Sequence, residues 1–267
     1  MSSEESIQED GPDPIELRSY FVRSRNALAV RGRFSALYTD YYVHLMDQQI
    51  RYEMEDDRAL KDALAVSTLH LASRPWSEAI AWTLSWQDPP RNVFVTGSNR
   101  LGNVTGRVFT EDIQEREGNI LFAQTTVDGQ PGRHSMVDVE TYDFFSIAER
   151  YYEQSEQRPG RYFRHGEEDF VLVAAQPDCD LAWLRGLDDE VIRSLDSDEE
   201  LSLLERREYR FDCGCSQDLI FPLIAGMSDE TIDELFGGSE TLPASCPRCG
   251  ARYVITREAL EAFEGAG

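Results

Sequence analysis

The chain has 267 residues and a formal net charge of −24 at pH 7, with 41% hydrophobic and 28% charged residues. That length can build one substantial core plus a small appended domain. A chain this acidic repels nucleic-acid phosphates and anionic membrane surfaces, so we expect no nucleic acid and no membrane among its partners. Two explanations fit this acidity. The charge can keep a protein in solution while it exposes apolar surface, or it can reflect adaptation to a salty cytoplasm.

The first 14 residues are acidic and polar and include Pro12 and Pro14. This composition predicts a disordered tail over residues 1–14. The N-terminus lacks the basic and then apolar pattern of a signal peptide, and no run approaches the ~18 apolar residues of a membrane span. We therefore expect a cytoplasmic protein.

Residues 15–177 contain both helical and strand-like patterns, which predicts an N-terminal α+β domain. Apolar residues at helical spacing indicate helices over 58–73 and 142–157. Short apolar runs separated by turn residues predict a mostly antiparallel sheet. Its expected strands lie within residues 17–44, 81–86, 93–96, 104–109, 120–127, 134–139, 162–163 and 170–175.

The helix predicted over 142–157 has a broad aromatic face formed by Phe144, Phe145, Tyr151 and Tyr152. Such a face can bind other proteins. A helix that covers a sheet also needs an apolar face to build a core, and we favour that second role because apolar helical stripes are usually buried.

Residues 178–210 combine apolar side chains at helical spacing with dense acids, which predicts an acidic helical linker. The apolar residues are Leu184, Leu187, Val191, Ile192, Leu195, Leu201, Leu203 and Leu204. They can dock a helix on a neighbour, whereas the runs of like charge weaken that helix in isolation. The composition favours an ordinary solvated linker over a conformational switch.

Four of the five cysteines lie in the last segment, residues 211–267, which we predict to be a small zinc domain. Cys213 and Cys215 form a Cys-x-Cys pair, and Cys246 and Cys249 form a Cys-x-x-Cys pair followed by a glycine. Two close pairs at this separation place four thiolates around one tetrahedral ion, and zinc is the usual occupant of such sites. We therefore expect one Zn2+ per chain.

The segments around these cysteines carry helix and strand signals. Helices are expected over 216–225 and 228–236, the second with Ser228 as its N-cap. Pro222 should kink or shorten the first helix, at a cost of about 3 kcal/mol in a helix interior. A short strand over 252–255 and a last helix over 257–263 are also expected.

No second chemical site is apparent. Cys179 lies between Asp178 and Asp180, whose charges should raise its pKa and lower its reactivity. Neither a phosphate-binding loop nor a nucleophile elbow is found, so we expect no catalytic residue and no enzyme. The four histidines show no metal-binding spacing with one another: His44, His70, His134 and His165.

The cysteine pattern resembles the zinc-binding domain of the 33 kDa redox-regulated heat-shock chaperone family. Residues 151–159 (YYEQSEQRP) are also similar to that family's Tyr-Phe-x-x-Ser-Glu-Gln-x-Pro segment. The two motifs frame residues 142–258. Upstream, the resemblance rests on the order of elements and on short pieces such as residues 29–32.

The resemblance implies an ATP-independent holdase that is idle when reduced, with zinc on Cys213, Cys215, Cys246 and Cys249. On oxidation Cys213 would pair with Cys215 and Cys246 with Cys249, zinc would leave, and the linker would become disordered and expose a surface for unfolding client proteins. The resemblance further implies a homodimer as the active form and release of clients to ATP-dependent chaperones.

Two alternatives stay open. One is a constitutive zinc-ribbon interaction module or regulator without redox switching. The other is a thiol oxidoreductase that uses Cys246 and Cys249, although a Cys-x-x-Cys pair that also completes a zinc site fits this activity poorly.

Overall fold

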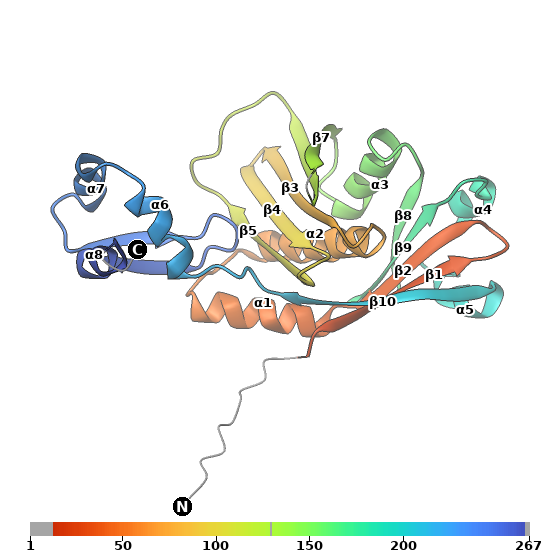
Figure 1. Ribbon diagram of the computed structural model, residues 1–267. Helices are drawn as coiled ribbons and strands as arrows, with labels where there is room; N and C mark the ends of the chain where they lie inside the picture. The colour runs from red at the N-terminus through yellow and green to blue at the C-terminus, as the bar shows by residue number, and fades with distance from the viewer. Residues whose placement is uncertain (1–12, 129, 265–267) are drawn as a thin grey trace, which may run out of the picture.

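The computed structural model describes residues 13–128 and 130–264 and shows a mixed α+β protein (Figure 1). A ten-stranded sheet carries most of the chain, and a two-stranded sheet forms near the C-terminus. The predicted α+β class is therefore confirmed. The predicted disordered tail lies outside the described residues, apart from Asp13 and Pro14.

The strands of the large sheet are β1 (Ile15–Val22), β2 (Ala27–Arg33), β3 (Glu78–Gln87), β4 (Pro90–Ser98), β5 (Asn103–Phe109), β6 (Asn119–Val127), β7 (Gln130–Val139), β8 (Gly160–Arg164), β9 (Asp169–Ala175) and β10 (Leu201–Phe211). Their order across the sheet is β7-β6-β3-β4-β5-β10-β1-β2-β9-β8. Each half of this order is antiparallel. The halves meet where β10 runs parallel to β5 through two residue pairs, Arg210 with Asn103 and Phe211 with Val104.

The main helices are α1 (Ser35–Asp47), α2 (Met54–Ala72) and α3 (Phe144–Gln154). α2 packs closely on the sheet, because a Cβ atom at Gly97 would lie 2.7 Å from Leu71 Cδ1 and one at Gly106 would lie 3.0 Å from Leu60 Cδ1. The aromatic face of α3 is buried in the same core. Its predicted structural role is therefore confirmed.

One correction concerns residues 17–44, where strands were predicted throughout. The structure has two strands and then α1. Residues rich in Tyr, Phe and Val favour strands, but Leu37, Tyr41 and Leu45 recur four residues apart and, with Tyr38, bury one face of a helix.

A second correction concerns the predicted helical linker over 178–210. Its first part forms the short helical elements α4 (Leu181–Gly186), η1 (Val191–Ser194) and α5 (Leu195–Asp198), whereas its last part is strand β10. β10 pairs antiparallel with β1, from Leu201 opposite Val22 to Tyr209 opposite Ile15. Its pattern has period two, because Arg207, Tyr209 and Phe211 are buried and their neighbours are exposed. The division of the chain into these predicted domains stays a prediction.

The C-terminal elements lie at one end of the molecule, opposite α4 and α5 (Figure 1). They are η2 (Gln217–Leu219), α6 (Phe221–Ala225), α7 (Asp229–Phe236), β11 (Thr241–Ser245), β12 (Arg252–Thr256) and α8 (Arg257–Glu264). They enclose a small core of Phe221, Ile224, Phe236, Ile255 and Leu260.

The prediction that Pro222 shortens the helix expected over 216–225 is confirmed, because α6 spans only Phe221–Ala225. Pro222 lies in the first turn of α6, where its missing N–H has no helical partner to lose. The predicted N-cap of α7 is confirmed, since the Ser228 hydroxyl accepts a hydrogen bond from the Thr231 amide at 3.3 Å. Among the described helices, none is long and apolar enough to cross a membrane.

Candidate metal centre

The four cysteines that the sequence singled out meet in space. The sulfur atoms of Cys213, Cys215, Cys246 and Cys249 all lie within 4.8 Å of one another. The shortest separations are 3.6 Å between Cys213 and Cys246 and 3.5 Å between Cys215 and Cys249. Tetrahedral Zn–S bonds of about 2.3 Å require sulfur atoms about 3.8 Å apart. The four thiols therefore fit one zinc ion.

Two backbone turns present these sulfurs. Strand β10 ends at Phe211, and Cys213 and Cys215 follow in a turn around Gly214, which has φ +61°. Cys246 and Cys249 lie in the connection between β11 and β12. There the Gly250 amide donates to the Cys246 carbonyl over 2.9 Å, and Gly250 itself has φ +79°. Glycine adopts such angles without strain, which allows the backbone to fold around the sulfur atoms.

Two donors reach the sulfur atoms from outside the cysteine set. The Tyr253 hydroxyl, on β12, lies 3.0 Å from the Cys215 sulfur, and the Ala251 amide lies 3.4 Å from that of Cys249. Hydrogen bonds to a thiolate favour the charged form, which is the form that binds a metal. The environment thus supports thiolate ligands.

The thiols differ in their acidity without a metal. Burial tends to raise the pKa of Cys246, but hydrogen bonds from the backbone of Cys249 and Arg248 outweigh it and bring the pKa to about 7. Burial raises the pKa of Cys215 to about 11. A hydrogen bond with the thiol of Cys249, followed by burial, raises the pKa of Cys213. Metal binding to this set must therefore displace protons, so its affinity falls as the pH falls.

The centre also contacts the large sheet and α1. His44 Nε2 lies 2.9 Å from the Cys249 carbonyl oxygen, and Arg107 on β5 donates to the Cys246 carbonyl over 3.0 Å. The Arg252 amide donates to the side chain of Gln48 over 2.7 Å. A Cβ atom at Gly250 would lie 3.0 Å from Ile50 Cδ1, so the turn packs directly on the residues after α1.

The sequence did not indicate the roles of His44, Arg107 and Tyr253. Tyr253 lies four residues beyond the last cysteine, which is a weak local signal. His44 and Arg107 reach the centre only through the tertiary fold, and no spacing could have indicated them.

Cys179 lies apart from this group. It packs against the buried cluster that contains Leu184 of α4, and burial followed by the charge of Asp180 raises its pKa. The predicted rise in pKa is confirmed, with burial as the larger cause. Within residues 13–128 and 130–264, the histidines join no cluster of metal-binding side chains.

Comparison with known proteins finds similarity in the part of the chain that contains the four cysteines. The family model described as "Hsp33 protein" matches residues 173–256. The 33 kDa chaperonin of Caldanaerobacter subterraneus is 32% identical over 73 residues, which are 27% of this chain and 25% of that protein. The 33 kDa chaperonin of Pectobacterium atrosepticum is 25% identical over 261 residues, which cover 85% of this chain and 89% of that protein.

The fold extends the likeness to nearly the whole chain. The crystal structure of the 33 kDa chaperonin (heat shock protein 33 homolog) from Thermotoga maritima superimposes with a TM-score of 0.72 at 12% identity. This superposition covers 96% of this chain and 100% of the Thermotoga chain.

The fold and the cysteine cluster define an α+β protein with a candidate four-thiol metal centre at the end of its central sheet. The comparisons support membership of the Hsp33 family, as a divergent member. Membership of this family supports a chaperone function.

Proposed function

We propose that this protein is an ATP-independent, redox-regulated holdase that binds zinc and is idle when reduced. Oxidation would form disulfides between Cys213 and Cys215 and between Cys246 and Cys249. Zinc would leave, part of the chain would unfold, and the protein would bind unfolding clients. The observation that carries the proposal is the short distance along the chain between the sheet and the centre, because β10 ends at Phe211 and the first ligand is Cys213.

The metal would be held by the four cysteine sulfurs, and when bound it supplies folding free energy. In small zinc-binding peptides that contribution is about 10 to 16 kcal/mol, comparable to the stability of a whole domain. Apart from the cluster around the cysteines, the core of the C-terminal elements contains five buried side chains. A core of this size does not stabilise a fold by itself and needs an additional contribution such as a bound metal.

The redox step balances without any enzyme. Two thiols of one pair lose two electrons and two protons to a peroxide or hypochlorite, and one S–S bond forms. All the sulfur separations are below 4.8 Å, so pairing within each motif is within reach. Each disulfide removes two metal ligands, and the folding free energy of the centre is lost with them.

The partners follow from the same proposal. Clients would be unfolding proteins with exposed apolar segments, the active form would be a homodimer, and ATP-dependent chaperones would receive the clients after reduction. The cytoplasm, where cysteines are kept reduced in unstressed cells, would be its location. No catalytic activity forms part of the proposal.

Light scattering from a thermally unfolding client would test the proposal. The protein is added either reduced and zinc-loaded or after oxidation, and zinc release is followed with a chromogenic chelator. We expect suppression of scattering only after oxidation, in step with zinc release. Equal activity in both states, with zinc retained, would contradict the switch.

That contradictory result would favour a second candidate, a constitutive interaction module with structural zinc. The pairing of β10 with β1 along its length is the observation in its favour, since a strand held in this way resists release.

A further inference from the structure

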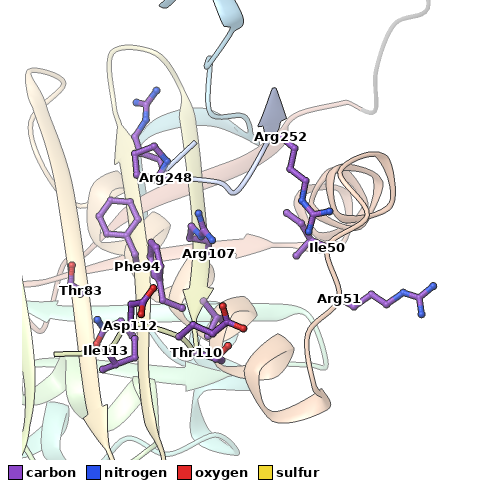
Figure 2. Close-up of a pocket in the computed structure, with 15 residues that line it drawn as sticks. Ile50, Arg51, Thr83, Phe94, Arg107, Thr110, Asp112, Ile113, Arg248 and Arg252 are labelled. Carbon is purple, nitrogen blue, oxygen red and sulfur yellow. The ribbon is translucent and has the colours of Figure 1, made fainter. Parts of the chain in front are cut away.

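A cavity of about 970 Å³ lies between the cysteine turn and the large sheet. Pro247, Arg248 and Arg252 line it from the C-terminal elements. Arg51 and Arg107 line it from the N-terminal part of the chain. In Figure 2 Arg107 lies between Arg248 and Arg252, while Arg51 extends away from the other three. The cavity is therefore shared by two parts of the chain that are distant in sequence.

The charge around this cavity is opposite to that of the protein. In the whole chain 50 acidic residues outnumber 26 basic ones, yet the cavity is lined by four arginines and two carboxylates, Glu111 and Asp112. Many arginines elsewhere pair closely with acids, as Arg91 does with Asp56 at 2.6 Å. In the described part of the chain, none of the four cavity arginines forms an ion pair. The cavity arginines are thus not paired with carboxylates, and Arg248 instead donates to the Cys213 carbonyl over 3.1 Å.

Arg107 is held in place at the cavity. Its guanidinium donates to the Cys246 carbonyl and lies 4.2 Å from the centroid of the Phe109 ring. Its Nε atom is buried without a hydrogen-bond partner. A fixed guanidinium loses little entropy when it binds a ligand, and its planar donors match phosphate oxygens.

We propose that this cavity binds a small anion with two or more phosphate groups, which bridges the cysteine turn and the large sheet. Arg107 and Arg252 contact the phosphates, and Arg248 and Arg51 add positive charge at the rim. The cavity volume is at the upper end of the range of ordinary ligand pockets, so a single phosphate would fill only a small part of it. Inorganic condensed phosphate and a nucleoside di- or triphosphate share this chemistry, and Phe94 in the same lining offers a ring to a base.

Isothermal titration of the reduced, zinc-loaded protein with inorganic triphosphate tests the proposal, with ATP and inorganic monophosphate as comparison ligands in magnesium-free buffer. We expect saturable binding of triphosphate with a Kd below about 1 mM that weakens as salt is added. Monophosphate should bind at least tenfold more weakly. Tighter binding of triphosphate than of ATP would identify an inorganic ligand, and the reverse would identify a nucleotide.

Three variants locate the site. Arg252→Gln removes an exposed guanidinium that makes no ion pair, and it should weaken triphosphate binding about tenfold, the usual effect of losing a charged hydrogen bond. Glu111→Gln removes an opposing charge and should strengthen binding severalfold. Arg193→Gln changes the net charge equally but lies on η1 at the opposite end of the molecule, and it should leave binding within twofold of the parent.

Several results would overturn the proposal. The first is that no saturable binding is found at a triphosphate concentration 10-fold above the expected Kd limit of ~1 mM. The second is that Arg252→Gln and Arg193→Gln weaken triphosphate binding equally. The third is that zinc is released in proportion to the heat of the titration. The last would mean that triphosphate only extracts the metal. Because every titration uses reduced protein, the outcome is independent of the proposed redox switch.

Discussion

His44 Nε2 lies 2.9 Å from the backbone carbonyl oxygen of Cys249, which connects the last turn of α1 to the cysteine centre. A carbonyl oxygen only accepts hydrogen bonds, so Nε2 of His44 is the donor in this contact. With the bond from Arg107 to Cys246, this contact holds the cysteine turn against the N-terminal elements.

We expect His44→Ala to loosen this attachment without removing a metal ligand. Loss of one hydrogen bond costs about 1 kcal/mol, which corresponds to roughly a fivefold larger open population of the turn. Hydrogen exchange of the peptide that contains Cys249 should accelerate by that factor, and oxidant-driven zinc release should also be faster. His134→Ala, at an exposed position on β7, is the matched control. Unchanged exchange in His44→Ala would show that the contact does not hold the turn.

Replacing a ligand should have a much larger effect. Cys246 is 5% exposed, and Cys246→Ser leaves three thiols at a site that needs four. We expect bound zinc, measured by elemental analysis of the purified protein, to fall from about one per chain to a small fraction, and the C-terminal elements to lose their protection from exchange. Cys179→Ser, outside the cluster, should retain full zinc. Full zinc in Cys246→Ser would contradict the assigned ligand set.

The cluster of four cysteines could be predicted from the sequence, because paired cysteines are a local pattern whose short spacing does not depend on the rest of the fold. The α2 and α3 helices could be predicted for the same reason, since their apolar periodicity is local. β10 could not. Its leucines at 201, 203 and 204 suggested a helix, whereas two of them are exposed, with 47% of Leu203 and 57% of Leu204 accessible. The partner that makes this segment a strand is β1, almost two hundred residues away, and that pairing is invisible in a local pattern.

Arg207 provides a test of how firmly β10 is held. Its guanidinium is buried and donates to the carbonyl oxygens of Arg74 at 2.7 Å and Leu71 at 3.3 Å. Arg207→Met leaves these buried acceptors with fewer partners, which typically costs about 1 to 3 kcal/mol. If release of β10 activates the protein, we expect this variant to suppress client aggregation under milder oxidation than the parent.

The neighbouring Arg206 is the matched control, since its side chain is 56% exposed and points to the other face of β10. Arg206→Met should behave as the parent in light scattering and in limited proteolysis within β10. If both variants require the same oxidant dose as the parent, the stability of β10 does not set the activation threshold.

His70 gives the fold a defined response to acid. It is 1% exposed, and its Nδ1 atom lies 3.0 Å from the Tyr152 hydroxyl. Burial, followed by the charges of Arg74, Arg158 and Arg133, lowers its pKa well below 6.5. The folded state therefore keeps this ring neutral, while the unfolded state takes up a proton near pH 6.5. Below that pH the unfolded state binds more protons, so this group lowers the free energy of unfolding as the pH falls and has no effect above about pH 7.5.

The expected contribution of His70 is about 1.4 kcal/mol of lost stability per pH unit between pH 6.5 and its folded-state pKa. Urea denaturation of the parent and of His70→Gln at pH 8.0, 6.0 and 5.0 measures it as a difference in slope. The variant should be less stable at pH 8.0, because the ring and its bond to Tyr152 are lost, yet less sensitive to acid. His134→Gln, at an exposed histidine, should retain the parent slope. Parallel pH profiles for the parent and His70→Gln would mean that the ring does not control the acid response of the core.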